Sequence, residues 1–223
     1  MRFANREEAG RLLAQQLEHY KDRHDVVVLG LVRGGVPIAF EVAKALHAPL
    51  DVFILRKLGV PGHEELAFGA IASGGVHVLD QETIDAAGLS PFEIGEALTQ
   101  AQQEMERREG LYRSDSSSLK LTGKTAILVD DGIATGSSMR AAIAALRKMK
   151  AERIVIAVPV APLSTYRQLR CEADDVVCSH TPESFYAVGA FYDDFSQVTD
   201  EEVIRLLSLS KSLLYQRHAV HCP

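Results

Sequence analysis

Cysteine and long apolar runs are scarce in this 223-residue sequence, and both shortages narrow the class of protein. Three cysteines, Cys171, Cys178 and Cys222, are too few for a disulfide framework and form no Cys-x-x-Cys metal pattern. No apolar run reaches the roughly 18 residues that a membrane-spanning helix needs, and no charged-then-apolar leader follows Met1. We therefore expect a cytoplasmic protein with reduced thiols and no membrane contact.

The chain also lacks an excess of basic residues. The chain carries 24 Lys and Arg against 30 Asp and Glu, a formal net charge of −6, which predicts no general affinity for nucleic acid or anionic membranes. The hydrophobic fraction of 47% and the charged fraction of 24% are those of an ordinary globular protein and exclude disordered and fibrous classes. A chain of this length buries roughly 70% of its unfolded surface, enough for one large core.

Short apolar, β-branched runs alternate with amphipathic helical patterns along most of the chain. This alternation predicts an α/β fold with a doubly wound, mainly parallel sheet flanked by helices and a small helical or hood appendage. Ligands of such sheets bind beyond the carboxyl ends of the strands. The core strands are expected at 26–29, 52–55, 125–130, 153–159 and 175–179.

The whole chain, 1–223, is predicted to form a single domain. Its parts are a core at about 24–80 and 120–180, a helical insertion at about 81–113 and a C-terminal hood and helix at about 181–216. We also expect a loop at 59–65, short strands near 66–72 and 76–79, a long helix at 91–112, a linker at 114–118 and a frayed tail at 216–223. The long helix has the length to pack against a partner subunit, which makes a homo-oligomer possible.

The most informative segment follows the apolar strand that ends at Val129. Asp130 and Asp131 come directly after the strand, and a turn rich in Gly, Thr and Ser then leads into a helix. Free backbone N–H groups, hydroxyls and the positive end of a helix dipole suit a phosphate. Carboxylates repel a phosphate, so they must face sugar hydroxyls or a hydrated cation. A phosphorylated ribose satisfies both requirements, whereas the alternative is a solvated turn that caps a helix.

This segment resembles the phosphoribosyl pyrophosphate (PRPP) signature of type I phosphoribosyltransferases, and the resemblance extends over about 24–195, most closely to bacterial members. It implies Mg²⁺-dependent transfer of a phosphoribosyl group from PRPP to a nitrogenous acceptor of the nucleobase class, with release of pyrophosphate, in nucleotide salvage. Asp130 and Asp131 would contact the ribose hydroxyls and hold Mg²⁺, directly or through water. PRPP would also be bound by Gly132, Ile133, Ala134, Thr135, Gly136, Ser137 and Ser138.

A second turn, Arg33-Gly34-Gly35, follows the first strand and opens a helix. Its spacing is not the dinucleotide pattern Gly-x-Gly-x-x-Gly. In the family that it resembles, such a turn binds the pyrophosphate leaving group, often through a cis peptide bond. The resemblance thus predicts a cis bond between Val32 and Arg33 and a catalytic role for Arg33. The alternative is a glycine-rich connection without a ligand.

Arg56 and Lys57 are expected to end the second strand. Two cations there suit a pyrophosphate whose negative charge grows as its bond to the sugar breaks, with Lys57 catalytic and Arg56 binding PRPP. The resemblance implies a flexible loop that closes over the reacting centre, and 58–66 is the candidate. The alternative is a pair of surface cations.

The acceptor is the least defined part of the interpretation. Pro159 and Val160 end a strand where the family often contacts the base, and Phe185 and Tyr186 are candidates for stacking, although aromatic pairs also pack cores. Relatives that act on oxopurines have an Asp where this chain has Ala134, which counts against hypoxanthine or guanine.

Two other functions stay open at this stage. Some relatives keep the PRPP site but act as PRPP-sensing regulators that bind nucleic acid, and the net acidity of the chain makes nucleic acid an unlikely partner. The basic clusters that leave this possibility open are Arg107, Arg108 and Arg113, and Arg147, Lys148 and Lys150. A PRPP-binding accessory subunit without turnover is the third interpretation.

Overall fold

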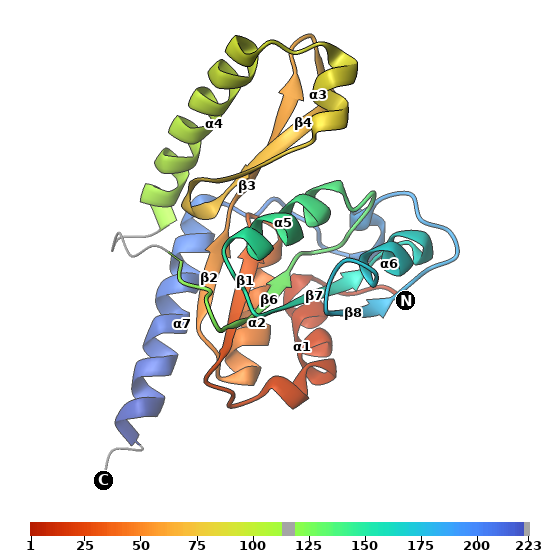
Figure 1. The fold of residues 1–223 in the computed structure, drawn as a ribbon. Helices are drawn as coiled ribbons and strands as arrows, with labels where there is room; N and C mark the ends of the chain where they lie inside the picture. Colours follow the sequence, from red (N-terminus) through yellow and green to blue (C-terminus); the bar gives the residue numbers. More distant parts are fainter. Residues whose placement is uncertain (113–118, 221–223) are drawn as a thin grey trace.

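A five-stranded parallel sheet forms the centre of the computed structural model, which describes residues 1–112 and 119–220 (Figure 1). The strand order is β2-β1-β6-β7-β8, so the chain winds outward from β1 in both directions, as predicted for a doubly wound sheet. Its strands are β1 (Val26–Leu31), β2 (Leu50–Phe53), β6 (Thr125–Val129), β7 (Arg153–Val160) and β8 (Asp175–His180).

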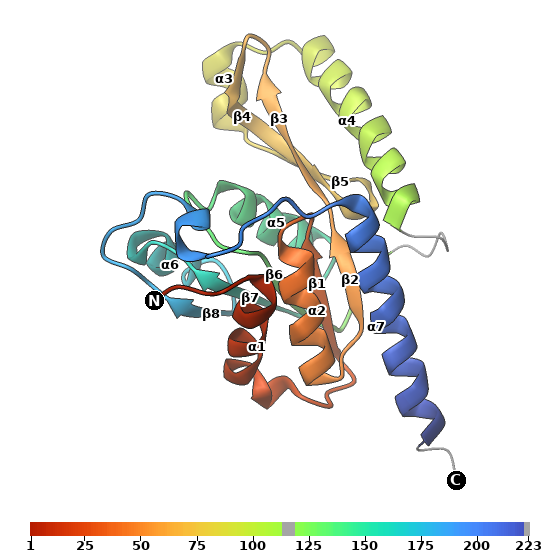
Figure 2. The same ribbon diagram turned by 180° about the vertical axis from the view of Figure 1, so that it is seen from behind.

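Helices cover both faces of this sheet (Figures 1 and 2). One face is covered by α1 (Arg6–Gln16) and α2 (Gly35–Leu46), with α7 (Asp200–Val220) packed on α2 and β2. The other face is covered by α5 (Ser137–Lys148) and α6 (Leu163–Leu169). Short 3₁₀ turns occur at η1 (Glu18–Tyr20), η2 (Ser73–Gly75) and η3 (Val188–Phe191).

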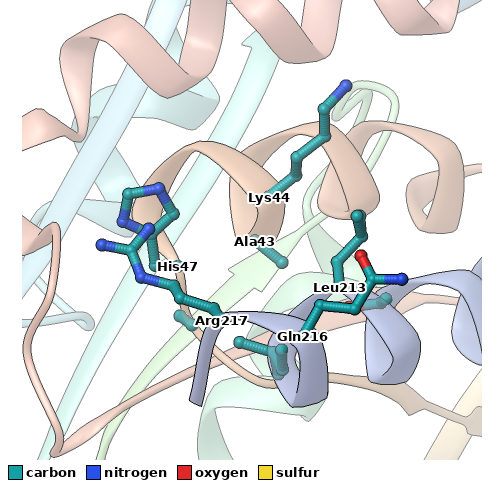
Figure 3. A pocket seen from close by; sticks show the side chains of 9 residues that line it. Ala43, Lys44, His47, Leu213, Gln216 and Arg217 are labelled. Carbon is teal, nitrogen blue, oxygen red and sulfur yellow. The ribbon is translucent and has the colours of Figure 1, made fainter. Parts of the chain in front are cut away.

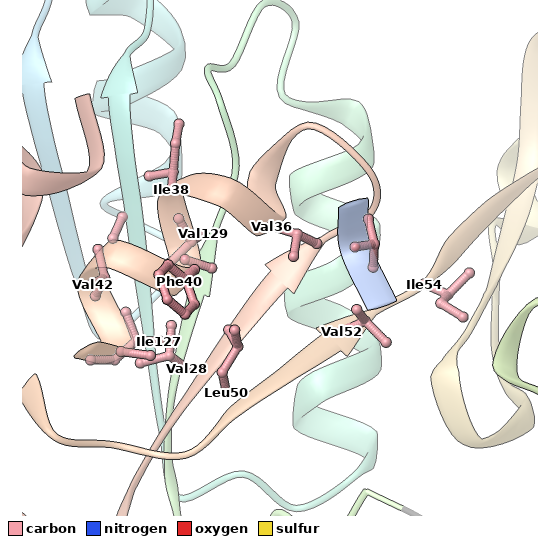
Figure 4. Packing of buried hydrophobic residues seen from close by; sticks show 14 of the residues in the cluster. Val28, Val36, Ile38, Phe40, Val42, Leu50, Val52, Ile54, Ile127 and Val129 are labelled. Carbon is pink, nitrogen blue, oxygen red and sulfur yellow. The ribbon is translucent and has the colours of Figure 1, made fainter. Parts of the chain in front are cut away.

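The alternation of side chains along each strand divides the core into two clusters. Val28 and Ile127 face α2, where Figure 4 shows them beside Val42 and Leu50. Their sequence neighbours Leu29 and Leu128 face α5, and all four strand side chains have no exposed surface. Strands buried on both faces therefore read as continuous apolar runs, which is why they were recognisable in the sequence.

The appendage is a three-stranded antiparallel sheet with two helices, and the single residue Ile54 separates β3 from β2. Its elements are β3 (Leu55–Val60), β4 (His63–Ala72), β5 (Val76–Leu79), α3 (Gln81–Ala87) and α4 (Pro91–Tyr112). In Figure 1 it stands above the carboxyl ends of β1 and β2. One face of its sheet packs on α5 and the other on α4.

The loop predicted at 59–65 is wrong, whereas closure of residues 58–66 over the reacting centre stays a prediction. The chain forms a β-hairpin there, because Val60 pairs with His63 across the two-residue turn Pro61-Gly62. Gly62 has φ +76°, and Pro followed by a left-handed Gly is the preferred sequence of a type II turn. Register shifts between Leu58 and Val60 interrupt the pairing and hide the strand from a sequence reading.

Side-chain caps begin two of the helices, α1 and α4, and the second of these starts at residue 91 as predicted. The Asn5 side chain accepts from the Glu8 N–H at 2.9 Å, and Ser90 and Glu93 form a reciprocal capping box. The C-terminal helix runs to Val220, so the frayed tail predicted from residue 216 is wrong as far as residue 220. The predicted linker at 114–118 lies outside the described residues. Within the described part of the chain, no helix is both long and apolar enough to cross a membrane.

Candidate functional site

Two turns meet at the carboxyl ends of the neighbouring strands β1 and β6. The β1–α2 turn spans residues 32–34 and the β6–α5 turn spans 130–136. A Cβ atom on Gly35 would lie 2.4 Å from the Val129 carbonyl oxygen, and one on Gly34 would lie 2.1 Å from Asp131 Oδ2. Real side chains do not tolerate these separations, so glycine at both positions allows the two turns to touch.

The peptide bond between Val32 and Arg33 is cis, which confirms the prediction for the β1–α2 turn. The Arg33 side chain is 37% exposed, and its Nη1 lies 3.8 Å from Oδ1 of Asp200, the first residue of α7. The same Asp200 oxygen accepts a hydrogen bond from the Tyr112 hydroxyl at the end of α4. Burial and this carboxylate raise the pKa of Tyr112 to about 12. Arg33 therefore stands where the appendage, α7 and the turn come together.

Two hydrogen bonds hold the β6–α5 turn in place, while its residues Ala134 and Thr135 are exposed. The Ile133 N–H donates to the Val160 carbonyl at 2.9 Å, and the Thr165 hydroxyl donates to the Ala134 carbonyl at 2.9 Å. Gly136 has φ +78° and precedes α5 directly. The first N–H groups of a helix have no partner within it, so the start of α5 presents donors to an anion.

Lys57 connects the appendage to this turn. Its Nζ donates to Ser137 Oγ at 2.6 Å, and that hydroxyl lies 3.3 Å from Thr135 Oγ1. Arg56 and Lys57 were predicted to end the second core strand. They lie inside β3 instead. Successive side chains of a strand point to opposite faces, so Lys57 points toward α5 and Arg56 shares the other face with its pairing partner Ile71. The structure thus separates the two cations that the sequence placed together.

The two acids have different surroundings. Asp131 Oδ2 accepts from Arg6 Nε at 3.0 Å and Nη2 at 2.8 Å, and the Asp131 side chain is 15% exposed. Asp130 Oδ1 accepts from the Asp131 N–H at 2.9 Å. Burial and the neighbouring Asp131 charge raise the pKa of Asp130. Burial also raises the pKa of Asp131, where the Arg6 guanidinium opposes the shift.

Sequence reasoning missed Arg6 and Tyr192 as neighbours of the acids. The Tyr192 hydroxyl donates to the Asp131 carbonyl at 2.6 Å, and burial raises its pKa above the usual value. Arg6 lies 125 residues from Asp131, so no motif contains both. One local signal existed: a cation at the first position of a helix opposes the helix dipole, which favours acids there.

The residues predicted to bind the acceptor differ in exposure. Pro159 and Val160 lie in β7 with buried side chains, so they offer little side-chain surface to a ligand. Phe185 stacks on Phe191 with ring centroids 5.4 Å apart, and Tyr186 is 93% exposed. Phe185 and Tyr186 follow the carboxyl end of β8, which is at the same edge of the sheet as the two turns.

A cavity lies elsewhere in the molecule. Figure 3 shows a pocket of about 580 Å³ between α2 and α7, with Ala43, His47 and Leu213 in its lining. It is formed by the C-terminal end of α2, whereas the candidate site lies at the N-terminal end of this 12-residue helix, about 18 Å away. The pocket is therefore separate from the meeting point of the two turns.

The phosphoribosyl transferase domain model matches residues 4–196, which include both turns and Arg6. The chain belongs to this family. The match begins well before residue 24, where the sequence resemblance was expected to begin, because α1 and its Arg6 are part of the phosphoribosyl transferase domain.

Relatives with known sequences or structures agree with this membership. "Putative phosphoribosyl transferase Rv0571c" and "Putative phosphoribosyl transferase MT0597", from two strains of Mycobacterium tuberculosis, are each 46% identical over 210 residues. The alignment covers 92% of this chain and 46% of each relative, so the chain spans about half the length of these relatives. The crystal structure of TT1426 from Thermus thermophilus is 40% identical, with a TM-score of 0.82 over 93% of this chain and 98% of that one.

Proposed function

We propose that this phosphoribosyl transferase domain transfers the phosphoribosyl group of PRPP to a nitrogen atom of a small acceptor and releases pyrophosphate. The observation that carries the proposal is the contact between the two turns at Gly34 and Asp131. One turn offers anion donors and the other offers anion donors together with two acids. A ligand that spans both needs an anion at each end and hydroxyls between them, and PRPP has this arrangement.

Each part of the donor has a matching set of residues. The 5′-phosphate fits the start of α5, with the hydroxyls of Thr135 and Ser137 beside the helix N–H groups. The ribose hydroxyls fit Asp130 and Asp131. The pyrophosphate fits the β1–α2 turn, where the partly exposed Arg33 would exchange its 3.8 Å pairing with Asp200 for the anion.

The reaction needs positioning and charge stabilisation rather than a protein nucleophile. The lone pair of the acceptor nitrogen forms a bond to C1 of the ribose, the C1–O bond breaks, and its electron pair leaves with pyrophosphate. The acceptor nitrogen then passes its proton to solvent water. We assign to Arg33 the charge that grows on the leaving group, and we assign it also to Lys57, whose Nζ would leave Ser137 Oγ to reach the pyrophosphate. Removing one such donor typically costs about 3 kcal/mol of transition-state stabilisation.

The acids also fit Mg²⁺, which takes oxygen ligands and usually combines one or two carboxylates with substrate oxygens and water. Among residues 1–112 and 119–220, no cluster of three His, Cys, Asp or Glu side chains is suited to a metal. Asp130 is the better placed of the two acids, because Asp131 Oδ2 is taken by Arg6. The bound ion would supply charge neutralisation to the oxygens of the donor.

For the acceptor we propose a nucleobase that reaches the site from the side of Phe185 and Tyr186. The exposed Tyr186 ring and the Phe185–Phe191 stack provide aromatic surface beyond the end of β8. Ala134 provides no carboxylate for an oxopurine, so a base other than hypoxanthine or guanine is expected.

The basic clusters that kept the regulatory interpretation open are largely paired within the chain. Arg107 and Arg108 both donate to Glu104 at 2.8 Å, and Arg147 Nη1 lies 2.8 Å from Asp174. Arg113 lies outside the described residues. Paired cations attract phosphate backbones less than free ones, so we retain the transferase as the proposal.

The test is a pyrophosphate-release assay with PRPP, Mg²⁺ and a panel of nucleobases, together with calorimetry of PRPP binding. We expect micromolar-range PRPP binding and release of pyrophosphate with at least one base. The Asp130→Asn/Asp131→Asn double variant should lose PRPP binding. Unchanged affinity in that variant would overturn the site assignment. Binding without release for any base would instead favour the accessory or regulatory interpretation.

A further inference from the structure

The Arg6 side chain is fixed on three sides. Its Nε and Nη2 donate to Asp131 Oδ2, its Nη1 donates to the Ser196 carbonyl at 2.7 Å, and its guanidinium carbon lies 3.9 Å from the centre of the Phe195 ring. The side chain is only 12% exposed. Ion pairs on open surfaces contribute little, but an enclosed guanidinium with every nitrogen engaged has one orientation.

The same part of the molecule also holds the backbone of Asp131. The Tyr192 hydroxyl donates to its carbonyl, and the Tyr192 ring packs against Phe3 and Phe195 with centroids 5.4 and 5.0 Å away. The Phe3 N–H donates to the Phe191 carbonyl at 2.8 Å, which ties the segment before α1 to the segment after η3. We call Phe3, Arg6, Tyr192 and Phe195 the Asp131 clamp.

The clamp holds the Oδ2 atom of Asp131, and Arg6 donates no hydrogen bond to Oδ1. Both Arg6 donors engage Oδ2, which is also the oxygen nearest to Gly34, while Oδ1 lies farther from that glycine. An acid held in this way needs no rearrangement to accept a hydroxyl through Oδ1.

Charge gives Arg6 a second effect. Asp130 and Asp131 are adjacent carboxylates, and PRPP itself is strongly anionic. Like charges at short range in a partly buried site repel strongly. Arg6 compensates one of the two acids and so lowers the repulsion that the donor meets.

We propose that Arg6 is a positioning residue for the sugar of the donor: it holds Asp131 by Oδ2 so that Oδ1 accepts a ribose hydroxyl, and it cancels the excess negative charge of the acid pair. This inference rests on the function proposed above. It assigns a role to α1, which carries none of the recognised PRPP motifs.

The test compares Arg6→Gln with Arg11→Gln, a variant of the same helix whose arginine pairs with Glu7 on the surface. Calorimetry measures the binding of PRPP, ribose 5-phosphate, 2,3-dideoxyribose 5-phosphate and inorganic phosphate to each protein. Arg6→Gln should weaken PRPP binding about 10-fold to 100-fold, the range for loss of a charge-assisted hydrogen bond. It should also lose most of the preference for ribose 5-phosphate over the dideoxy analogue. Phosphate binding should fall less than PRPP binding, because phosphate meets the same added repulsion but has no ribose hydroxyl for Asp131 to accept. Arg11→Gln should match the wild type.

The outcomes separate this inference from the proposed function. A wild-type protein that does not bind PRPP overturns the proposed function itself. A folded Arg6→Gln protein that keeps the sugar preference overturns the inference, and so does an equal loss of all four ligands, which indicates structural damage. If Arg6→Gln does not fold, Arg6→Lys replaces it, since lysine keeps the charge but cannot donate from two positions to Oδ2. Arg6→Lys should show a reduced sugar preference, and a wild-type preference would again overturn the inference.

Discussion

The Asp131 carboxylate occupies the space that a side chain at position 34 would need, because Oδ2 lies 2.1 Å from the place of a Cβ on Gly34. Gly34→Ala should therefore push the two turns apart. We expect PRPP affinity to fall at least about 10-fold and the free energy of unfolding to fall by about 1–3 kcal/mol, as for other overpacked positions. Calorimetry with PRPP and urea denaturation measure the two effects.

Gly95→Ala is the matched control, since Gly95 lies in the exposed part of α4 with nothing within 4 Å of an added Cβ. Alanine favours a helix over glycine, so this variant should gain up to about 1 kcal/mol and bind PRPP as the wild type does. Wild-type PRPP affinity in Gly34→Ala would show that the contact between the turns is dispensable.

A second prediction separates the neighbouring cations of β3. Lys57 donates to Ser137 on the α5 side of the appendage sheet, whereas Arg56 lies on the other face. Lys57→Met should weaken PRPP or pyrophosphate binding about 10-fold or more, because a charge-assisted hydrogen bond contributes about 1.5–3 kcal/mol. Arg56→Met should have a clearly smaller effect. Titration of both variants with pyrophosphate measures the difference, and equal losses would show that both side chains reach the ligand.

The sequence was most informative where a short segment contains both the strand and the turn that follows it. The cis bond after Val32 was predicted from the resemblance to type I phosphoribosyltransferases, whereas the β6–α5 turn with Asp130 and Asp131 and the glycine pair at 34–35 were predicted from local patterns. The parallel sheet was predicted in the same way, from the continuous apolar runs of strands that are buried on both faces. These features depend on the chemistry of a few consecutive residues, so one sequence is enough to find them.

The contacts that complete the site are long-range and left no comparable pattern. Arg6 meets Asp131 only because α1 packs on α2 and the segment after η3 returns to the N-terminus. The hairpin of β3 and β4 was missed because a bulge breaks the alternation that marks a strand. The same error hid the separation of Arg56 and Lys57. Both residues lie inside β3, where successive side chains point to opposite faces of the sheet.

The acid pair predicts an unusual pH dependence of stability. Burial and the Asp131 charge raise the pKa of Asp130 above its unfolded value of about 3.9. Between the two values the folded protein binds more protons than the unfolded one, so the free energy of unfolding falls as pH rises through this window. Asp130→Asn removes that cost. In EDTA it should therefore be more stable than the wild type at pH 7, with a difference that shrinks toward pH 4, in urea denaturation at each pH.

Asp25→Asn provides a control of opposite sign. Hydrogen bonds from Arg23 and Thr125 lower the pKa of Asp25 to about 2. Its contribution to stability is present above the unfolded pKa of about 3.9 and is lost as pH falls through the folded value. Asp25→Asn should thus be less stable than the wild type at pH 7, with most of the difference lost as pH falls toward 2. If Asp130→Asn behaved in this same way, Asp130 would be a stabilising ionised group, contrary to our interpretation.

The last prediction concerns Cys178, whose thiol lies in β8 near the strand end that leads to the proposed acceptor side. Burial raises the pKa of Cys178 to about 11, and its Sγ lies 3.3 Å from the His180 carbonyl. At pH 8 only about one thiol in a thousand is then ionised, and the thiolate is the reactive form. Iodoacetamide should alkylate the exposed Cys171 much faster than Cys178 in a Cys222→Ser background. Peptide mass spectrometry over a time course measures both rates, and urea should make them similar. Comparable rates in the folded protein would mean that Cys178 is an accessible thiolate, contrary to its burial in β8.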